Sequence, residues 1–176
     1  PELGEGLGLI RTGELEAARA LDGARQFFTR AFDYGFSKSA DEAFAHWPKE
    51  QVLADVVAVI RTYRPQVIIS VWAGTPRDGH GQHQASGILA NEAFEAAADP
   101  GRFRDLRGLA AEPWGVSKLY HSARFRGPGS GADGLTVQTG IFDPLLGRSY
   151  YQLAMESRSQ HRSQEMGAAQ ALGDRT

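Results

Sequence analysis

The stretch from residue 66 to residue 97 constrains the fold more than any other part of this chain. A short and nearly continuous apolar run, Gln66–Trp72, is typical of a parallel strand buried on both faces. A polar loop with His80 and His83 follows, and residues 84–97 then repeat apolar side chains at helical spacing. With a second strand expected over 116–121, the order predicts a βαβ unit in an α/β fold.

Hydrophobic periodicity and the placement of glycine and proline predict the remaining elements. The strongest pattern is a helix over 49–63, which Pro65 ends. A helix over 13–22 is expected to start at Thr12 and stop at Gly23, after a loop over 1–12. The other expectations are a strand and turn over 25–36, a glycine-rich mobile loop over 127–134, a strand over 136–139 and a helix over 148–165.

Composition narrows the class of protein. A length of 176 residues suits one domain, and a net charge of −2 gives no electrostatic reason to expect nucleic acid as a partner. No apolar run of about 18 residues is present, so no membrane span is expected. The absence of cysteine excludes thiolate ligands, so a metal here would use His, Asp or Glu. Because the chain opens with Pro1 and a glycine-rich segment, we expect residues upstream of it.

The two imidazoles lie where the predicted strand ends and the next helix begins. In open α/β sheets, ligands collect at this edge. A neutral imidazole is also among the best zinc ligands. Although an isolated His-x-x-His pair is more often structural than metal-binding, His80 and His83 at this place predict part of a metal-assisted hydrolytic site.

Three segments in order resemble the PIG-L (LmbE-like) de-N-acetylases. The first is Arg11-Thr12-Gly13-Glu14-Leu15-Glu16-Ala17-Ala18; the second runs from Arg61 to Gly87 and contains Gly79-His80-Gly81-Gln82-His83; the third is His161-Arg162-Ser163-Gln164. The resemblance implies zinc-dependent hydrolysis of N-acetyl groups, usually on amino sugars. It also implies a Rossmann-like three-layer α/β sandwich with a mostly parallel sheet, and a single catalytic domain over 1–176.

The resemblance also implies roles for individual residues. His83 would be a zinc ligand, and His80 would stabilise the developing oxyanion or protonate the leaving amine. Arg11 falls at a position that faces substrate in the family; the equal alternative is a surface pair with Glu14 or Asp55. Trp72 directly follows the strand and would either wall the substrate pocket or pack against the core. The substrate implied is a small N-acetylated sugar or glycoconjugate.

Two departures from the family pattern carry consequences. The family's Ala-His-Pro-Asp-Asp motif, which supplies its other zinc ligands and its general base, is absent from these 176 residues, and so is the first strand. We therefore expect an N-terminally incomplete domain that is inactive alone and associates with the missing segment or a larger assembly. Second, Gln82 stands where the family often has Asp, so Asp78 is a candidate for the acid that orients His80.

A rival interpretation is a non-catalytic carbohydrate-binding or structural module that retains the fold. The missing motif and the neutral Gln82 motivate it. In that case His80 would make only a structural hydrogen bond in its loop. The sequence predicts structural roles for His46 and His121, and for His161 a role in helix packing.

Overall fold

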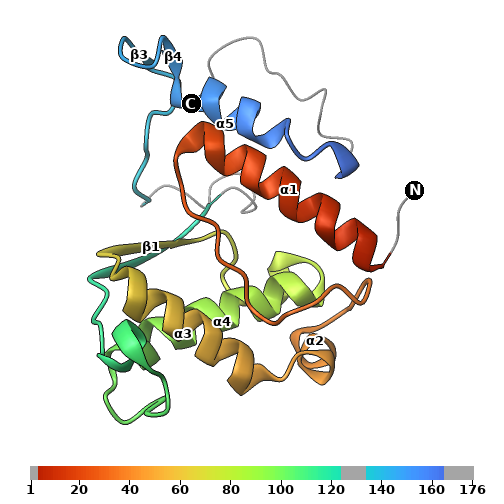
Figure 1. Cartoon of the computed structure of the whole chain (residues 1–176), viewed down its shortest axis with the longest axis vertical. Coiled ribbons are helices and arrows are strands. Elements are labelled where there is room, and N and C mark those ends of the chain that lie inside the picture. Colours follow the sequence, from red (N-terminus) through yellow and green to blue (C-terminus); the bar gives the residue numbers. More distant parts are fainter. Residues whose placement is uncertain (1–3, 124–133, 165–176) are drawn as a thin grey trace. The chain divides into compact units, whose positions relative to one another are not determined.

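The computed structural model describes residues 4–123 and 134–164, which fall into two compact units. The central unit runs from Phe28 to Gly134, and the terminal unit combines the segments on either side of it (Figure 1). Each unit has its own packing. In neither described part is any helix long and apolar enough to cross a membrane.

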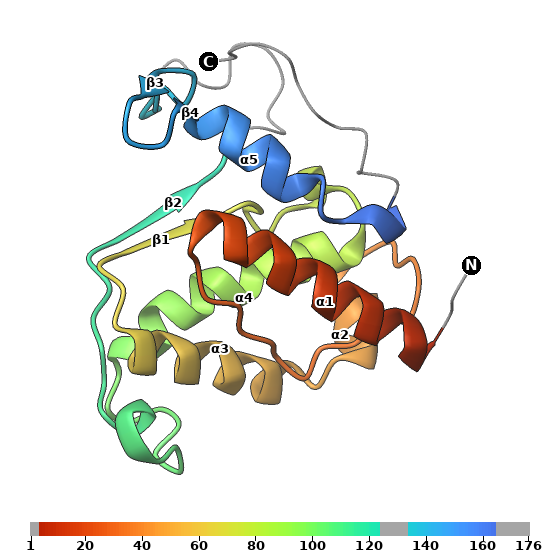
Figure 2. The same ribbon diagram turned by 45° about the horizontal axis from the view of Figure 1, so that its top comes forward.

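The central unit contains the predicted βαβ unit. Strand β1 (Val67–Ser70) leads through the short 3₁₀ turn η1 (Pro76–Asp78) into helix α4 (Gly81–Ala98), and the chain returns as β2 (Lys118–His121). The two strands pair in parallel, with Val67 opposite Lys118 and Ser70 opposite His121 (Figure 2). Helices α2 (Ala40–His46) and α3 (Lys49–Tyr63) precede β1, and the 3₁₀ turn η2 (Gly108–Ala111) lies between α4 and β2. This is an α/β architecture, as predicted.

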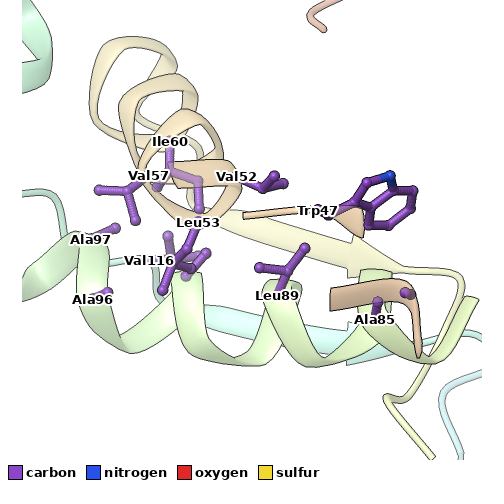
Figure 3. Packing of buried hydrophobic residues seen from close by; sticks show 12 residues of the cluster. Trp47, Val52, Leu53, Val57, Ile60, Ala85, Leu89, Ala96, Ala97 and Val116 are labelled. Carbon is purple, nitrogen blue, oxygen red and sulfur yellow. The ribbon is translucent and has the colours of Figure 1, made fainter. Parts of the chain in front are cut away.

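The core of the central unit lies between α3 and α4. Helix α3 contributes the larger apolar side chains at helical spacing, and the side chains that α4 packs against them are mainly alanines (Figure 3). Because alanine is small, the two helices approach closely. Burying each large aliphatic side chain contributes about 1.5–3 kcal/mol to folding. The buried side chains of these two helices are Val52, Leu53, Val57, Ile60, Ala85, Leu89, Ala93, Ala96 and Ala97.

Within the described part of the central unit, strand β1 is covered on one face only, which differs from the prediction of a strand buried on both faces. Ile68 packs against the core cluster, whereas the neighbouring Ile69 is 71% exposed. A nearly continuous apolar run does not distinguish these cases, because it fixes the side chains and not the elements that cover them. The described structure thus shows a helical layer on a two-stranded parallel sheet.

A buried arginine closes the C-terminal end of α4. Arg61, on α3, is only 1% exposed, and its guanidinium donates to backbone carbonyls rather than to a carboxylate. The acceptors are the carbonyl oxygens of Ala96 (3.2 Å), Ala97 (3.1 Å), Asp99 (2.8 Å), Arg102 (3.1 Å) and Ala110 (3.5 Å). These include last-turn carbonyls that have no partner within the helix, and the positive charge matches the negative end of the helix dipole.

The terminal unit pairs two helices. Helix α1 (Glu5–Asp22) packs against α5 (Tyr150–Arg158), where Ala18 is fully buried and the Ser157 hydroxyl donates to the Ala18 carbonyl at 3.4 Å. The short antiparallel pair β3 (Phe142–Asp143) and β4 (Arg148–Ser149) precedes α5, and the 3₁₀ turn η3 (Arg162–Gln164) follows it. Ser149 caps α5 through a reciprocal pair of hydrogen bonds with Gln152.

Helix α3 matches its predicted limits, but the predicted start of the first helix is wrong. Helix α1 begins at Glu5 and includes residues that we expected in a loop. Thr12 lies inside it and donates its hydroxyl to the Gly8 carbonyl at 2.9 Å instead of capping a helix start. Two early glycines suggested a loop, yet each costs only about 1 kcal/mol in a helix. Gly23 ends α1 in the left-handed conformation, as predicted.

Three other boundaries also differ. Residues 25–36 form no strand; they are extended and irregular. Residues 136–139 are likewise not a strand, although the Thr139 carbonyl accepts a bond from the Tyr151 N–H at 2.8 Å. The helix predicted over 148–165 is shorter, because α5 ends at Arg158. The loop predicted over 127–134 lies outside the described residues, except for Gly134.

Candidate active site

Two imidazoles lie together at the N-terminus of α4. His80 is the residue that precedes the helix, and His83 lies in its first turn. Their ring centroids are 3.6 Å apart, and the ring planes are inclined at 33°. The sequence predicted both imidazoles at this junction of strand and helix, with His80 in the loop and His83 at the helix start.

The His83 ring is held with one nitrogen committed to the protein. Its Nδ1 lies 3.0 Å from the Asp78 carbonyl oxygen, which only accepts, so Nδ1 carries the hydrogen. Burial lowers the pKa of His83, and the nearby His80 acts in the same direction, whereas Asp78 opposes the shift. The neutral form of the ring is therefore favoured, with the lone pair on Nε2. A metal-ligating imidazole needs this state and this kind of support.

An aromatic stack also fixes the plane of His83. The Trp72 indole lies against it with ring centroids 3.6 Å apart and an interplanar angle of 14°. Both rings are partly buried. Stacking leaves the edge of the imidazole, and hence its nitrogens, available for hydrogen bonds or a metal.

The His80 ring is oriented by an amide. Its Nδ1 lies 2.8 Å from Gln82 Oε1, and the same oxygen accepts from the Ser37 hydroxyl at 2.7 Å. Gln82 Nε2 donates to the Gly35 carbonyl, which defines which end of the amide is oxygen. Ser37 is fully buried and accepts a further bond from the Tyr34 hydroxyl at 3.1 Å. Because Gln82 Oε1 can only accept, Nδ1 of His80 carries the hydrogen and donates it to this oxygen.

The prediction that Asp78 orients His80 is not what the structure shows. The Asp78 carboxylate accepts from the backbone N–H groups of Ala73 (3.2 Å), Gly74 (2.7 Å) and Thr75 (2.7 Å). It therefore builds the loop before α4, and its backbone carbonyl, not its acid, holds His83. The sequence therefore identified Asp78 as a supporting residue, but it supports His83 and not His80, and it does so through its backbone carbonyl and not its carboxylate.

Two glycines of α4 let neighbouring backbone approach the site closely. A Cβ atom at Gly81 would lie 2.0 Å from the Ser39 carbonyl oxygen, and one at Gly87 would lie 2.1 Å from the Gly74 nitrogen. The Gly81 N–H donates to the Ser37 carbonyl at 2.8 Å. Gln84 reinforces the same contact, since its side chain accepts from the Ala40 N–H at 3.2 Å. The segment 35–39 and the loop 73–79 are thus both fixed against the first turns of the helix.

The other candidate residues have different surroundings. Arg11 lies on α1 of the terminal unit, and its assignment to substrate binding stays a prediction. Hydrogen bonds from Ser163 lower the pKa of the neighbouring Glu14, and the Arg11 charge acts in the same direction. Asp55, the alternative partner, instead pairs with Arg30. His46 stacks on Tyr34 with centroids 4.0 Å apart, and His121 bonds Asn91 through Nε2 at 3.0 Å. Both of these contacts fit structural roles.

His83 is suited to be one zinc ligand, because its Nδ1–H is held by the Asp78 carbonyl and its Nε2 carries the lone pair that a metal binds. A catalytic zinc site needs three protein ligands. Over residues 4–123 and 134–164, no group of three or more His, Asp or Glu side chains is placed to hold a metal. Further ligands would come from outside the described residues.

Sequence reasoning missed Ser37, Tyr34 and Gly35 as parts of the site. They lie 45 or more positions before Gln82, at the end of the expected strand and turn over 25–36 or, for Ser37, directly after it. No local motif marks them. Only the packing of segment 35–39 on the start of α4 brings the buried hydroxyl to the amide.

Residues 1–94, more than half of the chain, match the PIG-L family, described as GlcNAc-PI de-N-acetylase. Three relatives carry the name 1D-myo-inositol 2-acetamido-2-deoxy-alpha-D-glucopyranoside deacetylase. The Frankia alni protein (deacetylase 1) is 35% identical over 129 residues, which are 68% of this chain and 43% of that protein. The Geodermatophilus obscurus protein is 37% identical over 123 residues (65% and 40%), and the Thermobispora bispora protein is 30% identical over 129 (68% and 40%).

The similar region spans about two fifths of the length of these relatives. No solved structure matches the chain. The matched family region includes α1 and the loop with both imidazoles, so the resemblance seen in Arg11–Ala18 and Gly79–His83 is confirmed at the level of the family. The chain belongs to the PIG-L family.

Proposed function

We propose that this chain forms part of a metal-dependent hydrolase that removes the acetyl group from an N-acetylated amino sugar or glycoconjugate. One observation carries the proposal: His80 and His83 lie 3.6 Å apart, and an oxygen acceptor holds the Nδ1 of each. This leaves the Nε2 atoms of both rings for substrate and metal. Membership of the family and the names of the relatives support the reaction class.

His83 would hold the metal through Nε2, with its further ligands outside the described residues. A bound zinc ion would supply an activated water at neutral pH. The protein's own contribution is to favour the neutral imidazole through burial, and to orient the ring through the Asp78 carbonyl on one side and the Trp72 indole on its face. We thus propose that Asp78 and Trp72 position the ligand, and that Trp72 also lines the substrate pocket.

His80 would act on the substrate. Its Nδ1–H donates to Gln82, so a proton carried on Nε2 is the one it can present to the reacting amide. That proton would stabilise the charge that develops on the carbonyl oxygen or pass to the leaving amine nitrogen. A neutral amide stabilises the imidazolium less than a carboxylate would. The His80 ring would therefore be oriented by Gln82, which the Ser37 hydroxyl holds in place.

We also propose that both units belong to one catalytic domain covering 1–176, within a Rossmann-like three-layer sandwich. Arg11 would then bind substrate from α1. Membership of the family supports this proposal. The rival function, a non-catalytic sugar-binding module, is motivated by the neutral Gln82.

The test uses the full-length protein and two matched variants. His83→Phe keeps a flat ring that can stack on Trp72 but removes both nitrogens, and His46→Phe does the same at the ring stacked on Tyr34. Release of acetate from N-acetylglucosamine is measured with zinc, after chelation and after zinc is restored. We expect the wild type and His46→Phe to be active only with metal, and His83→Phe to lose at least about 100-fold. Binding of the sugar without turnover in the wild type would favour the rival function, and equal activity of all three proteins would refute the role of His83.

A further inference from the structure

Phe36 is an exposed aromatic side chain beside the candidate active site. It is 73% exposed, yet its ring lies edge-on to His80, with centroids 5.8 Å apart and planes at 62°. The exposed Phe28 belongs to the same unit and has no described ring contact with either imidazole. A large apolar side chain in this position costs solvation free energy that its own packing does not offset. A ligand that covers the Phe36 ring would remove this solvation cost.

The backbone on both sides of Phe36 is fixed. The Gly35 carbonyl accepts from Gln82 Nε2, and the Ser37 carbonyl accepts from the Gly81 N–H at 2.8 Å. Gly35 has φ of 94°, a conformation that favours glycine, and its N–H bonds Asp33 at 2.9 Å. Phe36 is thus held between two residues tied to the first turn of α4. The backbone that carries this ring is thus ordered before a ligand binds.

The chemistry of the ring selects the kind of ligand. A pyranose ring presents a face of C–H groups that carry partial positive charge, and this face packs on the negatively charged face of an aromatic ring. The acetamide of the same sugar would then extend toward the neighbouring imidazole. We propose that Phe36 is a specificity-determining residue that packs against the sugar ring of the N-acetylated substrate. This inference rests on the proposed function and adds the group that recognises the sugar.

The experiment separates recognition of the sugar from catalysis. Rates are measured on the metal-loaded full-length protein with N-acetylglucosamine and with N-acetylethanolamine, an acyclic acetamide that has no ring to pack. Phe36→Ala should raise KM for N-acetylglucosamine about five- to tenfold, with kcat within about twofold. The same variant should leave the kinetics with N-acetylethanolamine unchanged. Phe36→Trp should keep the wild-type KM, and Phe28→Ala is the control at another exposed ring.

Several outcomes would overturn the proposal. An unchanged KM for the sugar, or an equal effect on both compounds, would mean that Phe36 does not recognise the ring. A fall in kcat alone would mean that it acts through His80. If the wild type hydrolyses neither compound, the proposed function fails, and calorimetric binding of N-acetylglucosamine decides the role of Phe36. Binding weakened five- to tenfold in Phe36→Ala would then support the contact, and equal affinities would refute it.

Discussion

The His83 imidazole lies nearly flat on the Trp72 indole, with ring centroids 3.6 Å apart. This contact joins the end of β1 to the first turn of α4 and restricts rotation of the candidate ligand. Under the proposed role of His83, Trp72 would support the metal ligand as well as line the substrate pocket.

Replacement of Trp72 should therefore weaken metal binding. We expect Trp72→Ala to raise the dissociation constant for zinc by about tenfold, as is typical when a group supporting a metal ligand is lost. Trp72→Phe keeps a stacking ring and should stay within about threefold of the wild type. Competition with a chelating dye measures both constants. Equal affinities for Trp72→Ala and the wild type would show that the stack does not position His83.

The Ser37–Gln82 contact should matter for turnover more than for binding. Ser37→Ala and Gln82→Leu each remove part of the hydrogen-bond chain that holds the Nδ1–H of His80. We expect each variant to lower kcat by about tenfold or more, with little change in KM. Ser86→Ala is the control, because that exposed hydroxyl bonds only the Gln82 carbonyl, at 2.7 Å. A change confined to KM would contradict the assigned role.

Arg61 should be critical for stability. Arg61→Met keeps the length of the apolar stem and removes the guanidinium, which leaves buried carbonyls at the end of α4 without their donor. We expect the free energy of unfolding to fall by about 3 kcal/mol or more. The exposed Arg104→Met should change it by less than about 0.5 kcal/mol. Urea unfolding of both variants checks this, and similar losses in the two would contradict it.

The Arg30–Asp55 pair should give an acid-sensitive contribution to stability. Hydrogen bonds from Arg30 lower the pKa of Asp55, against the opposing effect of burial. The folded state therefore favours the ionised carboxylate. Its contribution is complete above the ordinary pKa of about 3.9 and is lost as the pH falls through the lower folded value. Unfolding measured between pH 6 and pH 2.5 should show a flatter acid limb for Asp55→Asn, while the exposed Asp105→Asn should follow the wild type.

The sequence predicted those helices and strands that are defined by a pattern of neighbouring residues. Helix α3 has helical periodicity and a proline at Pro65, and the order β1, α4, β2 follows from one apolar run and one amphipathic segment. The segment 25–36 was mispredicted because its alternating aromatics resemble a strand. In the structure, side-chain bonds fix it instead of a strand ladder: Arg30 bonds Asp55, and the Trp47 indole donates to the Phe32 carbonyl at 2.8 Å.

The same distinction applies to the site. His80 and His83 could be identified because they lie three positions apart after a strand. The residues that support His80 could not be identified in this way. Ser37 is 45 positions from Gln82 and reaches it only through the tertiary packing of segment 35–39 on Gly81. The role of Asp78 also required coordinates, since a backbone carbonyl carries no signature in the sequence.

The zinc content of the full-length protein tests the central claim most directly. Wild type, His83→Phe and His46→Phe are purified in the same zinc-supplemented, chelator-free buffer, and bound metal is measured by elemental analysis. We predict close to one zinc per chain in the wild type and in His46→Phe, and almost none in His83→Phe. Full zinc occupancy in His83→Phe, or no metal in the wild type, would contradict the assignment of His83 as a metal ligand.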